Sequence, residues 1–178
     1  MVFSFVINKV YFTYHITYEC ERKRCPAYEK QYFEKIEQHY EIVFPSDYLS
    51  FLQNAEKQGY NFVENGDVTD WEVRFSELDE RFIETNRNLV DDVNPDPKRL
   101  IPFAWSVSSG NNYLFDYRTN PSSPSVVLMD HEEAMVREDA ESESETPEEA
   151  QELMEQNVRE AAGSFAEFAS RLQAYTAE

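Results

Sequence analysis

The residues best suited to chemistry lie in the second half of the chain, in one predicted strand and just after another. Asp116 stands between aromatic residues, and the run Asp130-His131-Glu132-Glu133 follows the apolar stretch 126–129. A carboxylate beside a histidine suits acid–base catalysis or metal binding. Neighbouring strand residues point to opposite faces, however, and the run lacks the second histidine of an HExxH helix. The sequence therefore favours a solvated strand end for 130–133 and a polar-face or turn-bonding role for Asp116.

Other patterns that could carry chemistry are weak. Cys20 and Cys25 have no second cysteine pair and no histidine cluster nearby, which indicates reduced thiols and not a zinc site. The stretch 108–112 lacks the spacing of a phosphate-binding loop. It predicts a hairpin turn in which Gly110 or Asn111 adopts a positive φ. The sequence predicts no catalytic residue, metal ligand or cofactor site.

Charge is the strongest compositional signal. The 178 residues include 35 acidic and 16 basic ones, for a net charge of −19. Such a chain is repelled by phosphate backbones, so nucleic-acid binding is not expected, and a basic partner is its electrostatic complement. Twelve of the acidic residues and two basic ones fall between Glu132 and Glu160. An apolar content of 41% excludes a wholly disordered chain and fits a single domain.

The elements that must position these residues are helices followed by strands. Pro26 and the apolar spacing that follows predict a helix over about 27–39, and Ser46 with Asp47 begins a second helix that stops near Gly59. Asn65-Gly66 predicts a hairpin turn within 61–75. A weakly helical stretch follows over 75–88, and 91–99 is turn-rich. Strand-like runs come next, at 101–105, 113–118 and 126–129.

The last third of the chain differs in composition from the rest. The stretch around 138–149 is too polar to bury and predicts a mobile loop. Pro147 begins a helix through about Ala162, and Ser164 with Glu167 forms a capping box for a final helix. The predicted fold class is therefore α+β, with N-terminal helices, a central and mainly antiparallel sheet, and a closing C-terminal helix.

The first 25 residues form a separate strand-like extension, and 26–178 a single domain. The extension has no basic leading segment, and Asn8, Lys9 and His15 interrupt its apolar run. It therefore resembles neither a signal peptide nor a membrane span. Together with the two unpaired cysteines, this predicts a cytoplasmic protein without a membrane partner.

Four blocks in order resemble one family. The segment IEQHYEIVFPSDYLSFL at 36–52 is similar to the opening of the SUKH superfamily, immunity proteins related to fungal cell-wall-synthesis regulators. The segments at 101–118, 126–132 and 161–172 resemble its central strand–turn–strand, next strand and closing helix. Three departures stand out: QNAEKQGYN replaces the usual Asn-Gly-Gly turn, 138–150 forms an acidic insertion, and 1–25 match nothing in the pattern.

This resemblance implies a non-enzymatic binding domain that captures the toxic domain of a cognate protein toxin. Such toxins are often nucleases, and nucleases are often basic, which agrees with the charge. Binding would occlude the toxin's active site. The residues predicted to contact the toxin are the tryptophan Trp71, as an anchor, and ten acidic residues: Asp70, Glu72, Asp130, Glu132, Glu133, Glu138, Asp139, Glu141, Glu143 and Glu145.

Several alternatives remain when the sequence alone is considered. Trp71 and Trp105 each suit either an interface anchor or a packed core residue, with packing favoured for Trp105. A regulatory scaffold with several weak partners is an alternative to the immunity protein. A hydrolase that uses Asp116 or His131 is a second alternative, and it requires a pocket that joins these side chains. The oligomeric state is not determined by the sequence.

Overall fold

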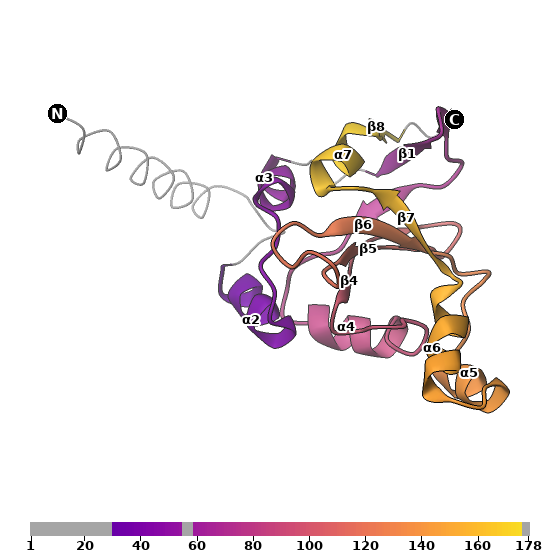
Figure 1. The fold of residues 1–178 in the computed structure, drawn as a ribbon. Coiled ribbons are helices and arrows are strands. Elements are labelled where there is room, and N and C mark those ends of the chain that lie inside the picture. Colours follow the sequence, from indigo (N-terminus) through magenta and orange to yellow (C-terminus); the bar gives the residue numbers. More distant parts are fainter. Residues whose placement is uncertain (1–29, 55–58, 176–178) are drawn as a thin grey trace.

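Two helices open the described part of the chain, residues 30–54 and 59–175, in a computed structural model (Figure 1). They are α2, Lys30–Tyr40, and α3, Ser46–Asn54. The Glu37 carboxylate accepts a hydrogen bond from the Phe44 amide at 2.7 Å and so braces the link between them. Both predicted helices are confirmed where the structure describes them. Residues 1–25, both cysteines and the predicted ends at 27–29 and 55–58 lie outside the described residues.

A curled antiparallel sheet forms the centre of the molecule. Its strand order is β2-β1-β3-β4-β5-β6-β7, and β8 pairs with β1. The strands are β1 Tyr60–Glu64, β2 Asp67–Val68, β3 Val73–Phe75, β4 Leu100–Ser106, β5 Asn112–Asp116, β6 Ser125–Met129, β7 Val158–Ala162 and β8 Leu172–Ala174. The predicted hairpin turn is confirmed, because Asn65 and Gly66 have φ values of 52° and 92°, the conformation of a tight two-residue hairpin. The structure thus confirms the predicted α+β class.

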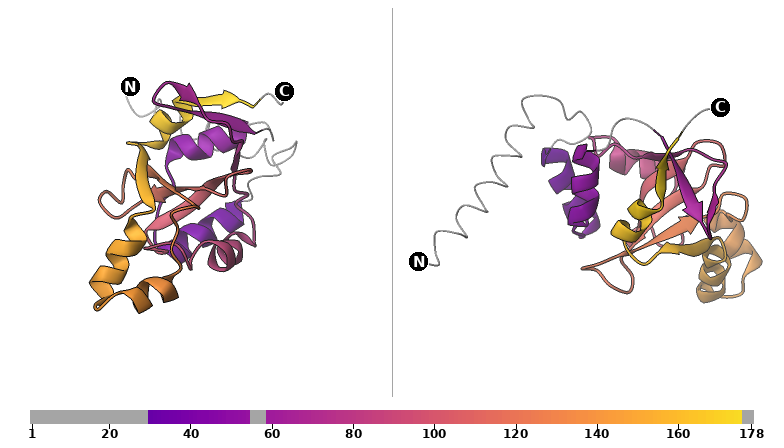
Figure 2. Two further views of the ribbon diagram at one scale, coloured as in Figure 1. Left: turned by 90° about the vertical axis from the view of Figure 1, so that its right-hand side faces the viewer. Right: turned by 90° about the horizontal axis from the view of Figure 1, so that it is seen from above.

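Four more helices surround this sheet (Figures 1 and 2). They are α4 Phe82–Leu89, α5 Arg137–Glu143, α6 Pro147–Glu155 and α7 Phe165–Ser170. The helix predicted over 75–88 therefore begins later, because 73–75 pairs with β4 as a strand. The predicted N-cap is confirmed, because Ser164 Oγ accepts from the Glu167 amide at 3.2 Å. The Glu167 carboxylate accepts from the amide of Gly163, one residue before the N-cap, at 2.9 Å, and not from the Ser164 amide of a standard capping box.

Two predictions for the last third are wrong. The mobile loop expected at 138–149 is instead the helical hairpin of α5 and α6, which packs around a small apolar cluster of Ala140, Ala150 and Met154. The helix expected to run to Ala162 ends at Glu155, and 158–162 is strand β7. β7 supplies the partner for the otherwise open edge of β6, and tertiary pairing of this kind overrides local helix propensity.

The sheet is buried on both faces. Aromatic side chains fill the face toward α2, α3 and α7, with Tyr48 completely buried among Phe44, Phe103, Phe115 and Phe165. The Phe103 and Phe115 rings stack with centroids 4.1 Å apart. The opposite face carries a smaller aliphatic cluster: Val90, Leu100, Leu114, Val127 and Met129. On β5, Tyr113 and Phe115 face the aromatic cluster and Leu114 faces the aliphatic one.

The curl of the sheet brings its two ends together across α7. Arg159 on β7 forms an ion pair with Glu64 on β1, although four strands separate β7 from β1 in the sheet order. Arg171, just after α7, donates from its guanidinium to the Ala161 carbonyl at 2.8 Å. Strand β8 then follows and pairs with β1. The last described element thus completes the end of the sheet that β1 begins.

Candidate partner-binding surface

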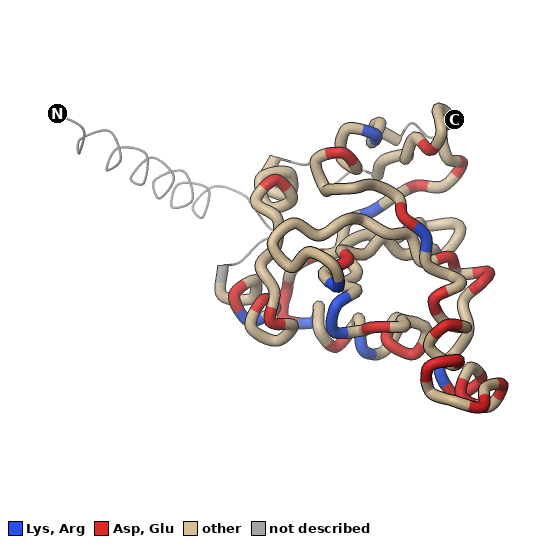
Figure 3. The backbone as a smooth tube through the Cα atoms, viewed as in Figure 1, with Lys and Arg blue, Asp and Glu red and all other residues tan. Residues whose placement is uncertain are grey.

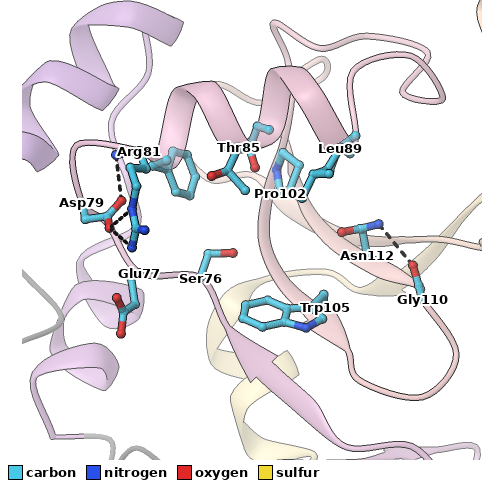
Figure 4. Close-up of a pocket in the computed structure, with 13 residues that line it drawn as sticks. Ser76, Glu77, Asp79, Arg81, Thr85, Leu89, Pro102, Trp105, Gly110 and Asn112 are labelled. Carbon is cyan, nitrogen blue, oxygen red and sulfur yellow. Dashed lines mark hydrogen bonds and ion pairs between the residues drawn. The ribbon is translucent and has the colours of Figure 1, made fainter.

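A groove of about 670 Å³ lies between α4 and the outer face of β4 (Figure 4). Its apolar walls come from Phe82, Leu89 and Val90 on the helix side and from Pro102 and Trp105 on the strand. Leu89 is 74% exposed and Trp105 is 39% exposed. Large apolar side chains on both walls of the groove are therefore open to solvent.

A bulge in β4 places Trp105 on this outer face. The pairing of β4 with β5 shifts between Pro102 and Ala104, so that Phe103 and Ala104 both pack into the aromatic core. The next side chain, Trp105, therefore points away from that core. The prediction that Trp105 packs in the core is therefore wrong. Pro102 is the signal that could have shown this, because proline within a strand marks an edge or a bulge.

Carboxylates lie at the end of the groove that is next to the N-terminus of α4. Glu77 and Asp79 line it there, together with Arg81 (Figure 4). The Arg81 guanidinium donates to Asp79 Oδ2 at 3.2 and 3.3 Å, and the Arg81 amide donates to Asp79 Oδ1 at 2.9 Å. The cation of this wall is therefore already matched by a carboxylate of the same wall, and the three side chains together carry a net negative charge.

The three residues of the predicted group at 70–72 lie in different surroundings. Trp71 is half-buried and packs against the aromatic core, and its indole N–H donates to the Tyr113 hydroxyl at 3.1 Å. Burial raises the pKa of Tyr113 to about 12. Glu72 instead forms an ion pair with Arg74, which is the pairing partner of Trp105 on the neighbouring strand. Asp70 is exposed beside them.

The predicted group at 130–133 forms a turn at the other end of the groove. Asp130 Oδ1 accepts from the Glu132 amide at 3.0 Å, and Asn111 Oδ1 accepts from the His131 amide at 2.9 Å. Gly110 lines the groove with a φ of 75°, as predicted for this hairpin. A Cβ atom on Gly110 would lie 3.1 Å from the His131 ring, so the two turns pack closely. The Glu132 and Glu133 side chains are exposed.

The remaining predicted carboxylates lie on α5 and the turn after it, and all five are exposed: Glu138, Asp139, Glu141, Glu143 and Glu145. The hairpin of α5 and α6 projects as a separate lobe (Figure 2) and carries dense acidic charge (Figure 3). Thr146 Oγ1 caps α6 by accepting from the Glu149 amide at 3.2 Å. Residues 137–155 contain nine carboxylates and one basic residue, Arg137.

Arg137 fixes this lobe to the loop that follows α4. Its amide donates to the Asp92 carbonyl at 2.9 Å, and its guanidinium donates to the Asn94 carbonyl at 2.7 Å. Two of the predicted groups adjoin residues that line the groove: Glu72 binds Arg74, the pairing partner of Trp105, and His131 packs against Gly110. The hairpin instead contacts the loop after α4, beyond the groove lining. The sequence analysis named acidic residues as the contacts of a partner, which stays a prediction, and it did not predict the groove.

Asp116 is held in a structural network and not in a catalytic pair. It is 7% exposed, and its carboxylate accepts from the Arg118 amide at 2.9 Å and from the guanidinium at 2.7 and 3.0 Å. Burial alone raises the pKa of Asp116, but the bonds and charge of Arg118 outweigh it, so the pKa lies below 3.8. Asp116 and His131 lie at opposite ends of the β5–β6 pair, about 15 Å apart. They cannot act on one substrate atom.

Replacing Asp116 by Asn is expected to lower the free energy of unfolding by about 1–3 kcal/mol at neutral pH, because it removes hydrogen bonds between charged groups. A carboxyl whose pKa is lowered by folding stabilises the protein above its unfolded-state pKa, and this contribution is lost as pH falls through the folded-state pKa. The difference between wild type and Asp116→Asn should therefore shrink in denaturant titrations as the pH is lowered below the ordinary range of carboxyl pKa values.

Glu155→Gln is the matched control for this prediction. It removes the other carboxylate that Arg118 binds. The Glu155 side chain is 33% exposed. Exposed ion pairs contribute little, so the expected loss is below about 1 kcal/mol. Equal losses for Asp116→Asn and Glu155→Gln, or a difference from wild type that does not depend on pH, would contradict the assignment.

Within 30–54 and 59–175, no group of three or more His, Cys, Asp or Glu side chains is arranged to hold a metal ion. In the same part of the chain, no helix has the length and apolar character that a bilayer crossing requires.

Residues 29–171 match the model of the SMI1 / KNR4 family (SUKH-1). The matched range contains the groove, the turn at 130–133 and the acidic hairpin. Neither the curated proteins nor the solved structures gave a match.

Proposed function

The chain belongs to the SMI1 / KNR4 family (SUKH-1), and from this membership we propose that it is a bacterial immunity protein that binds and neutralises a cognate protein toxin. The family supports an immunity-protein-like or related role that is exerted on a protein partner and is generally non-enzymatic. The finer assignment is our own: a single tight partner, basic in charge, inhibited by direct contact in the cytoplasm of the cell that makes both proteins.

The acidic hairpin is the observation that carries this proposal. Nine carboxylates lie on this lobe of two short helices, whose small apolar cluster is formed by Ala140, Ala150 and Met154 with Met135 and Leu153 packed against it. A dense patch of one charge attracts the opposite charge over long range and accelerates encounter. A basic toxin is the partner class that fits both this patch and the family.

Neutralisation would follow from occlusion. If the toxin is a nuclease, its active site binds phosphates through cationic side chains. Carboxylates of α5 and of the 130–133 turn can occupy the positions that phosphates would take, and the bulk of the domain then blocks the entry of nucleic acid. The same carboxylates disfavour nucleic acid as a ligand of the chain itself.

The proposal is tested by capture from lysate of the source cells, with the full chain as bait at low and at near-physiological salt. One stoichiometric basic protein is expected, and its expression alone should stop cell growth while co-expression of the chain restores it. Several weak partners without toxicity would instead indicate a regulatory scaffold. A stoichiometric partner that is acidic or harmless when expressed would contradict the proposal.

A further inference from the structure

We propose that the groove between α4 and β4 binds an exposed segment of the basic partner, with an apolar side chain of that segment seated on Trp105 and cationic side chains beside it. This inference rests on the proposed function and specifies the chemistry of its partner. The hairpin would attract the partner by charge, whereas the groove would hold it by contact.

Apolar exposure is the first observation behind this inference. Among the described residues, seven large apolar side chains are exposed, and two of them, Trp105 and Leu89, line this one groove. They lie on facing walls, with Pro102 between them (Figure 4). Tryptophan is enriched among residues that dominate binding energy when a partner covers them. A volume of about 670 Å³ is within the range of ligand-binding clefts and exceeds the size of one side chain.

Charge at both ends is the second observation, and it selects the occupant. Glu77 and Asp79 stand at the α4 end, and Arg81 is already bonded to Asp79. At the other end, Gly110 packs against His131, whose turn also carries Asp130, Glu132 and Glu133. An apolar floor between two acidic ends is complementary to a segment with an apolar centre and cationic flanks.

A second copy of the chain fits this groove poorly. Each copy carries a net charge of −19, so two copies repel one another at close approach. The groove is rimmed by the same sign of charge that a second copy would bring to it. A basic protein meets neither obstacle.

The inference is tested by fluorescence anisotropy with the full chain and three labelled peptides: Lys-Lys-Leu-Phe-Lys-Lys, Lys-Lys-Ser-Ser-Lys-Lys and Glu-Glu-Leu-Phe-Glu-Glu. The first should bind, and the other two should bind at least about tenfold more weakly, because each lacks one half of the complementary chemistry. Trp105→Ala and Leu89→Ser should each weaken the first peptide by about tenfold or more.

Val43→Ser is the matched control variant. Val43 is 70% exposed in the link between α2 and α3, away from the groove, so its replacement should leave peptide binding unchanged. All three substitutions are at exposed positions and should leave the fold intact, which thermal melting checks. The inference is overturned if Lys-Lys-Leu-Phe-Lys-Lys does not bind, if Lys-Lys-Ser-Ser-Lys-Lys binds equally well, or if Trp105→Ala binds as wild type does.

The two proposals fail in different ways. A toxin that the Trp105→Ala variant captures and neutralises as well as wild type does would overturn the groove inference and leave the proposed function intact. Peptide binding that requires Trp105, with a captured partner that is not toxic, would support the groove and contradict the immunity role. Concentration-dependent dimers that Trp105→Ala abolishes would show a second copy in the groove and overturn the inference.

Discussion

Converting the five carboxylates Glu138, Asp139, Glu141, Glu143 and Glu145 to their amides is expected to slow association with the captured basic partner by about tenfold or more at low salt. These side chains are exposed on the projecting lobe, where they act on an approaching partner at long range. The rate should also become less sensitive to salt, because fewer charges remain to be screened. Stopped-flow mixing at several salt concentrations measures both effects.

The control removes carboxylates at the far end of the molecule. Glu34→Gln with Glu41→Gln, on and just after α2, should change the rate much less per charge removed. Glu138 and Asp139 also lie in the first turn of α5, where negative charge stabilises a helix by about 0.3–1 kcal/mol each. Melting curves must therefore confirm that the amide variant is folded. An association rate equal to that of wild type would show that the hairpin does not steer the partner.

Tyr48→Phe is expected to stabilise the protein by about 1 kcal/mol, and Tyr48→Ala to destabilise it by about 3–5 kcal/mol. Tyr48 is 0% exposed, and its hydroxyl has no hydrogen-bond partner among the described residues. Burial without a partner costs free energy, which the loss of the oxygen relieves. The ring itself packs against Phe103, Phe115 and Phe165, with centroids 5.1–5.6 Å away.

Equilibrium unfolding in urea measures both Tyr48 variants. Phe44→Leu is a useful comparison, because it also alters the aromatic core but removes no polar atom. A stability loss above about 1 kcal/mol for Tyr48→Phe would show that the hydroxyl makes a favourable hydrogen bond. A small loss for Tyr48→Ala would mean that the core collapses around the missing ring.

Local chemistry explains which parts of the fold could be predicted. The Asn65-Gly66 turn and the Ser164–Glu167 cap depend on residues within a few positions of each other, and both are confirmed. Strand β7 could not be predicted from its own residues, because VREAA has no strand pattern and is defined by its pairing with β6. The α5–α6 hairpin was missed for a related reason: its cluster of Ala140, Ala150 and Met154 is too small to stand out in an acidic sequence.

The same distinction between local and tertiary causes applies to the candidate surface. Acidic groups are visible in composition, so their residues could be named in advance. The groove results from a one-residue shift at Pro102 that turns Trp105 outward, and from an α4 that starts later than its sequence predicts. Neither effect is a property of a local pattern. The role of Trp71 likewise depends on Tyr113, which is far away in the sequence.

The pairing of β8 with β1 has a consequence for biosynthesis. Phe62 pairs with Leu172, and strands β2 to β7 lie between these two residues in the sequence. A nascent chain therefore exposes the open side of β1 and an aromatic core without Phe165 and Phe168 until the segment from α7 to β8 leaves the ribosome. The last contacts of the sheet join residues that are synthesised far apart in time, so they form late in folding. Ribosome-stalled chains that end before α7 should remain sensitive to protease, and protection should appear only once β8 has emerged.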